Sequence, residues 1–318
     1  MSRAPKNIAV SVRDRLVSRA RERRENAQLL MTRYVIERLM YRLGRSPHRD
    51  RFILKGAMLF SLWADAPYRA TGGLDLLGAG ENAPEKLIPV FQEILAMDVE
   101  EDGILFRPET LRAEAARAED EYAGVRVDFL AELAGARLPM HVDIGYGDAV
   151  TPAPVAIEYP SLLDQPMAQL LAYPPETVVA EKFQAMVALD MINTRLKDFY
   201  DLWAIAGTFA FDGPTLARAI AATFERRQTA LPGGTPAALT AAYAAEKQAQ
   251  WAAFVKRTEI ALAPEPFPDV QAKIEQFVMP PVTAIVQDKT FTARWLPGGP
   301  WERRHGRRGM HHSRIIGR

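Results

Sequence analysis

The chain has 318 residues, of which 48% are hydrophobic and 25% are charged, and 40 Lys and Arg residues against 39 Asp and Glu residues give a net charge of +1. This composition is globular, is long enough for one large domain or two smaller ones, and excludes a whole-chain attraction to polyanions. The chain contains no cysteine, which excludes disulfides, thiolate catalysis and thiolate metal sites and is typical of a reducing compartment.

The N-terminal segment indicates where the protein works. Arg13 and Arg15 lie where a signal peptide needs an apolar core, and no apolar run reaches the length of a membrane span. We therefore expect a soluble, cytoplasmic protein.

Residues 11–44 are predicted to form two helices, the first beginning at Ser11 as its N-cap and the second ending at Gly44. The second helix has apolar side chains at helical spacing, namely Ile36, Leu39, Met40 and Leu43. The first has a basic stretch made of Arg19, Arg21, Arg23 and Arg24. Such a stretch is usually a solvated helix face, and the alternative is contact with RNA phosphates.

Between residues 51 and 145 short apolar strands alternate with helices. A strand over 51–54 is followed by a break at Lys55-Gly56 and by an apolar helix over 57–63. A further helix begins at Pro84, and strands are expected over 74–77, 103–106, 122–129 and 139–145. Residues 109–118 have a helical composition, but their position between strands argues against a helix.

From Glu176 onward the sequence is mainly helical. Helices are predicted over 176–190, 196–207, 214–227, 235–260 and 268–278, and the Gly- and Arg-rich segment 297–318 is predicted to be a disordered basic tail. The fold class that this order predicts is α/β (α+β). We expect N-terminal helices and a mixed sheet over 1–160, followed by a helical region over 161–296.

Two features of the strands could bind a nucleotide and a metal ion. Gly56, next to Lys55 at a strand-to-helix turn, would let backbone N–H groups approach a phosphate. Asp75 and Asp143 each lie among apolar residues of a predicted strand, where a carboxylate is costly to bury unless it binds something. Acids on adjacent strands suit Mg²⁺ and nucleotidyl transfer, although single buried acids are more often hydrogen-bonded at strand ends.

Four segments of the chain, in this order, resemble the AbiEii/AbiGii toxin family of nucleotidyltransferase-like proteins. They are RFILKGAMLFSLWADAPYRATGGLDLLG, HVDIGYGD, YPPETVVAEKFQAMV and RLKDFYDL. The resemblance implies a polymerase-β-like minimal nucleotidyltransferase core with a helical C-terminal region, as the toxin half of a toxin–antitoxin or phage-defence system. It also implies an NTP substrate, Mg²⁺ or Mn²⁺ as cofactor, an RNA acceptor, expected to be tRNA, and a cognate antitoxin encoded next to it.

The resemblance assigns roles to the residues of the first two segments. The family's glycine turn matches Lys55-Gly56-Ala57, although the family more often has Gly or Ser at the position of Ala57. Its paired acids fall on Gly73 and Asp75, so the second acid is present and glycine replaces the first. Its third acid matches Asp143. The resemblance therefore implies that Asp75 and Asp143 bind the metal.

The last two segments contribute Lys182, Asp198 and Asp201. Lys182 could reach a triphosphate, although a lysine on an apolar helix face can instead extend to solvent. Asp198 and Asp201 are spaced i, i+3, which is typical of a surface ion-pair cluster, whereas the resemblance places Asp198 at the nucleotide. The resemblance implies three catalytic residues, Asp75, Lys182 and Asp198, and a nucleotide site made by Lys55, Gly56, Ala57, Lys182 and Asp201.

Gly73 leaves the activity open. Side chains at 73 and 75 would face the same side of a strand and could grip one cation, so the loss of one acid is expected to lower the rate by on the order of 10²–10³-fold. Gly73 could instead only shape the turn with Gly72. Three functions remain: an enzyme impaired by Gly73, a catalytically inactive protein that binds NTP or its antitoxin, and a structural partner without nucleotide affinity.

Overall fold

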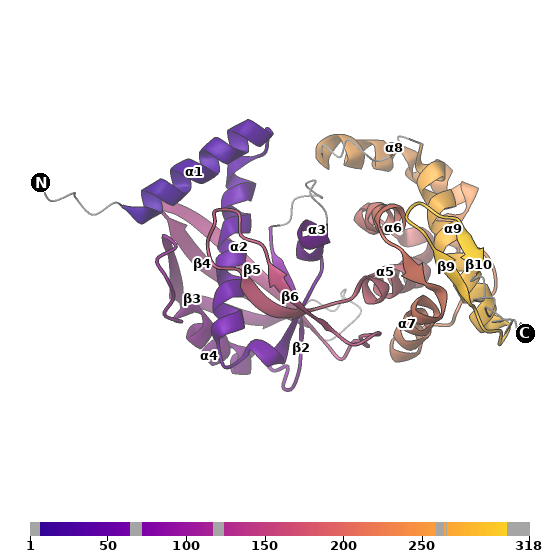
Figure 1. Ribbon diagram of the computed structural model, residues 1–318, viewed down its shortest axis with the longest axis horizontal. Coiled ribbons are helices and arrows are strands. Elements are labelled where there is room, and N and C mark those ends of the chain that lie inside the picture. The colour runs from indigo at the N-terminus through magenta and orange to yellow at the C-terminus, as the bar shows by residue number, and fades with distance from the viewer. Residues whose placement is uncertain (1–6, 64–71, 117–123, 259–263, 265, 304–318) are drawn as a thin grey trace, which may run out of the picture.

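The computed structural model describes residues 7–63, 72–116, 124–258, 264 and 266–303. Figure 1 shows two halves side by side: a sheet with the N-terminal helices around it, and a group of helices from the C-terminal part of the chain. The predicted α/β class with a mixed sheet and a helical C-terminal region is confirmed. No helix in these described ranges is long and apolar enough to cross a membrane.

The larger sheet has seven strands in the order β3-β4-β5-β2-β1-β7-β6. The strands are β1 (Phe52–Lys55), β2 (Leu74–Gly78), β3 (Ile104–Ala115), β4 (Gly124–Leu133), β5 (Ala136–Tyr146), β6 (Val155–Tyr159) and β7 (Ala168–Ala172). β2 is parallel to β5 and β1 is parallel to β7, whereas the other neighbours are antiparallel. β3 extends through Ala115, well beyond the strand expected over 103–106, so residues 109–115 are strand and not helix, and β7 continues the sheet beyond residue 160.

One face of this sheet is apolar and the other is polar, because strand side chains alternate. Leu54, Leu76 and Val142 are at most 1% exposed, whereas Lys55, Asp75 and Asp143 on the other face are half-buried. Helix α4 (Pro84–Leu95) packs on the apolar face, where the rings of Phe52 and Phe91 lie 5.9 Å apart. The polar face is therefore the one that can present charged groups.

The helices at the N-terminus differ from the prediction at their ends. α1 (Ile8–Arg23) is capped by Asn7, whose side chain accepts a hydrogen bond from Val10 N at 3.2 Å, so Ser11 is not its N-cap. α2 (Ala27–Arg45) continues through Gly44. A Cβ on Gly44 would collide with the backbone oxygen of Gln169 in β7, so this glycine allows close helix–strand packing and does not end the helix.

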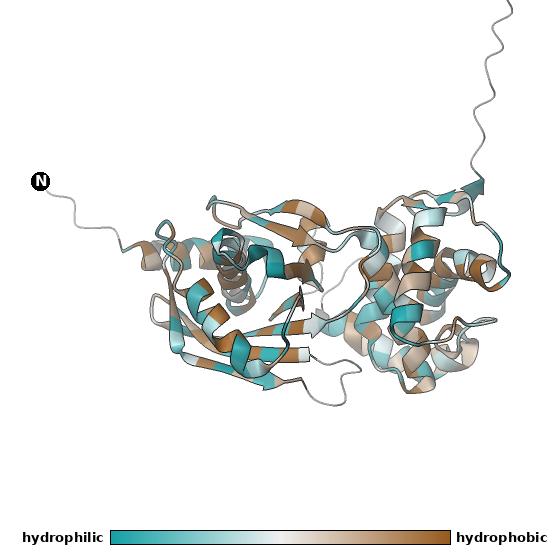
Figure 2. Ribbon diagram, turned by 90° about the horizontal axis from the view of Figure 1, so that it is seen from below, coloured by the Kyte–Doolittle hydropathy of each residue, from teal (hydrophilic) through white to brown (hydrophobic). Residues whose placement is uncertain are grey.

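The C-terminal half contains the predicted helices, here α5 (Pro175–Leu189), α6 (Leu196–Thr208), α7 (Gly213–Arg226), α8 (Ala241–Thr258) and α9 (Phe267–Val286). A small sheet has β8 (Phe211–Asp212), β9 (Ala293–Trp295) and β10 (Trp301–Arg303). α9 is longer than predicted, and β10 lies in the segment predicted to be a disordered tail; residues 304–318 lie outside the described residues. Short connecting elements are α3 (Met58–Trp63) and the 3-10 turns Arg49–Arg51, Asp190–Ile192 and Ala237–Leu239. In Figure 2 the C-terminal helices carry both hydrophilic and hydrophobic residues.

Candidate active site

Five ionisable residues lie opposite one another across five neighbouring strands. Reading across the sheet, the register pairs them in the order Lys55, Asp75, Asp143, Arg126 and Glu114. Directly paired residues share one face of a sheet, so all five belong to the polar face. We call this set the charged row. It confirms that Asp75 and Asp143 lie on neighbouring strands, here parallel and in register.

The glycine turn and the first of these acids meet at the end of β1. Gly56 has φ 74°, and a Cβ placed on it would collide with Asp75 Oδ2. Glycine is required here twice, for the left-handed backbone and for the close approach of the carboxylate. The structure thus brings Lys55, Gly56 and Asp75 together, as predicted, and places Ala57, which is 6% exposed, before the six-residue helix α3.

The position of the missing acid is filled by an imidazole. Gly73 is buried, precedes β2 and has no positive φ, so its backbone would accept a side chain. A Cβ built there would collide with Nε2 of His141, which lies two residues before Asp143 on the same face of β5. An acid at position 73 therefore requires His141 to move.

Asp143 is held by a cation of the protein itself. Arg126, opposite it on β4, donates from Nε to Oδ1 at 2.7 Å and from Nη2 to Oδ2 at 2.8 Å. Both carboxylate oxygens are therefore engaged. Within the described part of the chain, no group of three His, Asp or Glu side chains is arranged to hold a metal ion. The row in this arrangement does not fit the Mg²⁺ or Mn²⁺ ion that the resemblance implies.

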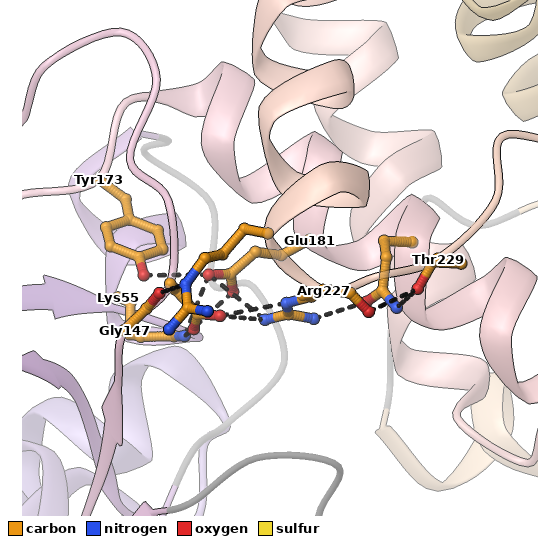
Figure 3. A network of polar contacts seen from close by, with 9 residues as sticks. Lys55, Gly147, Tyr173, Glu181, Arg227 and Thr229 are labelled. Carbon is orange, nitrogen blue, oxygen red and sulfur yellow. Dashed lines mark hydrogen bonds and ion pairs between the residues drawn. The ribbon is translucent and has the colours of Figure 1, made fainter.

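Lys55 belongs to a second set of charges where the two halves of the molecule meet (Figure 3). Its Nζ lies 2.9 Å from Asp148 Oδ2 and 3.0 Å from Glu181 Oε2. Arg227, which follows α7, binds the same two acids at 3.0 Å and 3.5 Å, and the Tyr173 hydroxyl donates to Glu181 at 3.0 Å. We call these five residues the junction network.

Burial and pairing compete in the junction network. Burial alone would raise the pKa of Asp148, but the charges of Lys55 and Arg227 outweigh it and lower the pKa to about 2. Burial lowers the pKa of Lys55, but the nearby Glu181, Tyr173 and Asp148 outweigh it and raise the pKa above its usual value. The pKa of Glu181 is raised because burial dominates. The ionisation of Lys55 and of Asp148 therefore depends on the charges of their partners in the network.

Lys182 lies next to Glu181 in sequence but in a different cluster. Its Nζ is 2.6 Å from Asp198 Oδ1 and 2.7 Å from Asp201 Oδ2, and Arg195 binds Asp198 at 2.9 Å. The side chains of Lys182, Asp198 and Asp201 are 14%, 3% and 0% exposed. Burial would raise the pKa of Asp198, but Lys182 and Arg195 keep it low. The interpretations as a surface cluster and as a solvent-directed lysine are therefore wrong.

Several residues of these clusters were not among the predicted site residues: Arg126, His141, Asp148, Tyr173, Glu181 and Arg227. One signal was available. Thr177, Glu181 and Gln184 share a helical face, and the structure buries Thr177 and Gln184 completely and turns Glu181 into the network. Buried polar groups require partners, so this stripe predicts a polar contact with another segment. No local signal identifies Arg227, which comes from the end of α7.

The fold is that of an α/β protein whose sheet has one charged face and is joined to a helical region through the junction network, and comparison identifies its family. A sequence model of the nucleotidyl transferase AbiEii toxin family of type IV toxin–antitoxin systems matches residues 38–276. Because this is more than half of the chain, the chain belongs to that family.

Two crystal structures from Helicobacter pylori resemble the fold. One is described as a candidate nucleotidyltransferase, with a TM-score of 0.45 and 12% identity over 84% of this chain and 100% of that chain. The other is JHP933, with a TM-score of 0.44 and 13% identity over 82% of this chain and 91% of that chain. No curated protein matches the chain.

Proposed function

We propose that the chain is the toxin component of a toxin–antitoxin pair, that it binds an NTP beside the Lys55-Gly56 turn, and that its nucleotidyl transfer to RNA, with tRNA as acceptor, is impaired. The observation that carries the impaired activity is the imidazole of His141 in the space that a side chain at Gly73 would occupy. Family membership supports the toxin role, a nucleotide substrate and an antitoxin partner. Fast transfer needs acids at both position 73 and position 75, and here only Asp75 is present.

The lysines proposed to bind the nucleotide already have their charge neutralised by carboxylates of the protein. Lys55 and Lys182 each bind two carboxylates, so an NTP must compete with these acids for either lysine. Asp75 at the turn keeps the catalytic role that the family resemblance implies for it, and Asp198 and Asp201 at Lys182 keep theirs. The second candidate function is an inactive protein that binds NTP or its antitoxin, and the same observation at Gly73 favours it.

A transfer assay distinguishes the two functions. Gly73→Asp alone would force the new carboxylate against His141, so the informative protein is the double variant Gly73→Asp, His141→Ala. With labelled NTPs and total tRNA, we expect it to label RNA on the order of 10²-fold faster than the starting protein. Addition of Asp75→Ala should abolish the gain.

The matched control is Gly72→Asp with His141→Ala. Position 72 is exposed, and apart from its chain neighbours no atom lies within 4 Å of a new Cβ, so Gly72→Asp adds the same charge one residue away without placing an acid at position 73. If the Gly73 double variant folds and labels no RNA with any NTP, the missing-acid account fails and the binding protein is the better interpretation.

A further inference from the structure

The ion pair between Arg126 and Asp143 lies on the open face of the sheet. The side chains are 52% and 38% exposed, respectively, and the two hydrogen bonds form a bidentate pair across β4 and β5. Pairs of this exposure contribute roughly 0–1 kcal/mol to stability. The contact is therefore not needed to hold the sheet together, and its effect is on the charge of Asp143.

This charge matters because Asp143 is in register with Asp75. Carboxylates on neighbouring strands repel each other, and a bound divalent ion would relieve that repulsion by accepting oxygens at about 2.0–2.6 Å. Here the guanidinium of Arg126 engages both Asp143 oxygens. His141 fills the space that a side chain at Gly73 would occupy, so no further acid is present there. The acid pair already has a cation beside it.

Resting on the proposed function, we infer that Arg126 is a built-in counter-ion that takes the place of a divalent cation at the acid pair Asp75–Asp143. These two interior strands, β2 and β5, then keep their charge balance without Mg²⁺ or Mn²⁺. Arg126 is a positioning residue, because it acts through Asp143. Its removal should allow Asp143, together with Asp75, to bind a cation, since Asp143 loses the guanidinium that engages both of its oxygens.

Mn²⁺ binding to the full chain, followed by electron paramagnetic resonance, tests this inference without nucleotide or RNA. We expect the starting protein to show no site below about 1 mM, which is the weak end for carboxylate sites. Arg126→Gln should gain one site that is at least about tenfold tighter, because it frees both Asp143 oxygens and removes a positive charge that repels the ion. Adding Asp143→Asn should remove that site again.

The matched control is Arg107→Gln. Arg107 makes the same kind of bidentate pair with Glu132 across β3 and β4, at 36% and 26% exposure, away from the acid pair. It should bind Mn²⁺ like the starting protein. The inference is overturned if the starting protein binds Mn²⁺ below about 1 mM through Asp143, or if Arg126→Gln binds it no more tightly. A failure of RNA labelling leaves this test intact, so the two proposals fail separately.

Discussion

The two cations that flank the acids of the charged row lie in opposite surroundings. Lys55 is 17% exposed and binds two carboxylates that are 7% and 14% exposed, whereas Arg126 is 52% exposed and binds one that is 38% exposed. Removing one partner of a buried pair leaves an uncompensated charge, but an exposed pair is solvated when it breaks. The Lys55 end therefore fixes how the two halves meet, and the Arg126 end is free to change with little effect on stability.

This difference indicates where the family's chemistry could be altered without loss of the fold. Arg126 is exposed and His141 is half-buried, and both lie on the polar face toward the Arg126 end of the row. Asp148, Glu181 and Arg227 lie where the halves join. Substitution of the polar-face residues changes which groups can bind a nucleotide or a cation. Substitution of the junction-network residues also changes how the two halves of the molecule pack.

The largest effect is expected at Lys182, which extends the buried side of the comparison. Lys182→Met leaves the buried carboxylates of Asp198 and Asp201 without this cation, so the free energy of unfolding should fall by about 3–5 kcal/mol in urea denaturation. Adding Asp201→Asn should recover part of the loss. A loss below about 1 kcal/mol, the range of an exposed pair, would contradict the assignment of this cluster to the buried class.

Glu37 in α2 tests burial with weaker pairing. Its side chain is 1% exposed, and burial raises the pKa to about 7, against smaller opposing effects of the Leu162 N–H and of Arg33 and Arg38. Between about pH 4.5 and pH 7 the folded protein holds a proton that the unfolded chain releases, so stability falls as pH rises. Above pH 7 the contribution is lost and stays constant.

The variant Glu37→Gln should lack this dependence. The difference in unfolding free energy between the two proteins should therefore change by about 3 kcal/mol between pH 4 and pH 8, measured by urea denaturation at a series of pH values. If the stability of the starting protein and of Glu37→Gln changed in parallel with pH, the raised pKa of Glu37 would be contradicted.

Asp148 gives the opposite sign of pH dependence. Its pKa is lowered to about 2 by Lys55 and Arg227 despite its burial, so its stabilisation is lost only as pH falls below 4.

The sequence predicted those parts of the fold that depend on local pattern. The strand at Asp75, the hairpin across Gly135 and helices α5 to α7 follow from periodicity and turn residues. The ends of α1 and α2 did not follow, because a side-chain cap at Asn7 and a tertiary contact at Gly44 set them.

The candidate site was predictable in its position but not in its pairing. The acids Asp75 and Asp143 and the turn at Gly56 could be located from strand pattern and family resemblance. Their partners could not, because Arg126 is brought to Asp143 by strand register and Arg227 reaches Asp148 from a helix about 80 residues later. Pairing between distant segments depends on the whole fold.

Gly56 tests the contact between the turn and the charged row. Gly56→Ala adds a Cβ at φ 74° that would collide with Asp75, so we expect a loss of about 2 kcal/mol or more in unfolding free energy. Gly80→Ala is the matched control, because it has φ 86° and open space around it, and it should lose only the backbone term of about 1 kcal/mol. Equal losses would mean that Asp75 moves aside without cost.

The smallest expected effect concerns the availability of Lys55. Glu181→Gln keeps an oxygen that can accept from Tyr173 but removes one of the two negative charges at Lys55, so the potential beside the Gly56 turn becomes more positive. NTP affinity should then increase by about tenfold, equivalent to about 1.4 kcal/mol, in calorimetric titration. Glu176→Gln, on the same helix but outside the junction network, is the control and should leave the affinity unchanged. If Glu181→Gln binds NTP no more tightly while remaining as stable as the starting protein, the phosphates of the bound NTP do not contact Lys55. The nucleotide must then bind at the Lys182 cluster, where Asp198→Asn should produce the increase in NTP affinity.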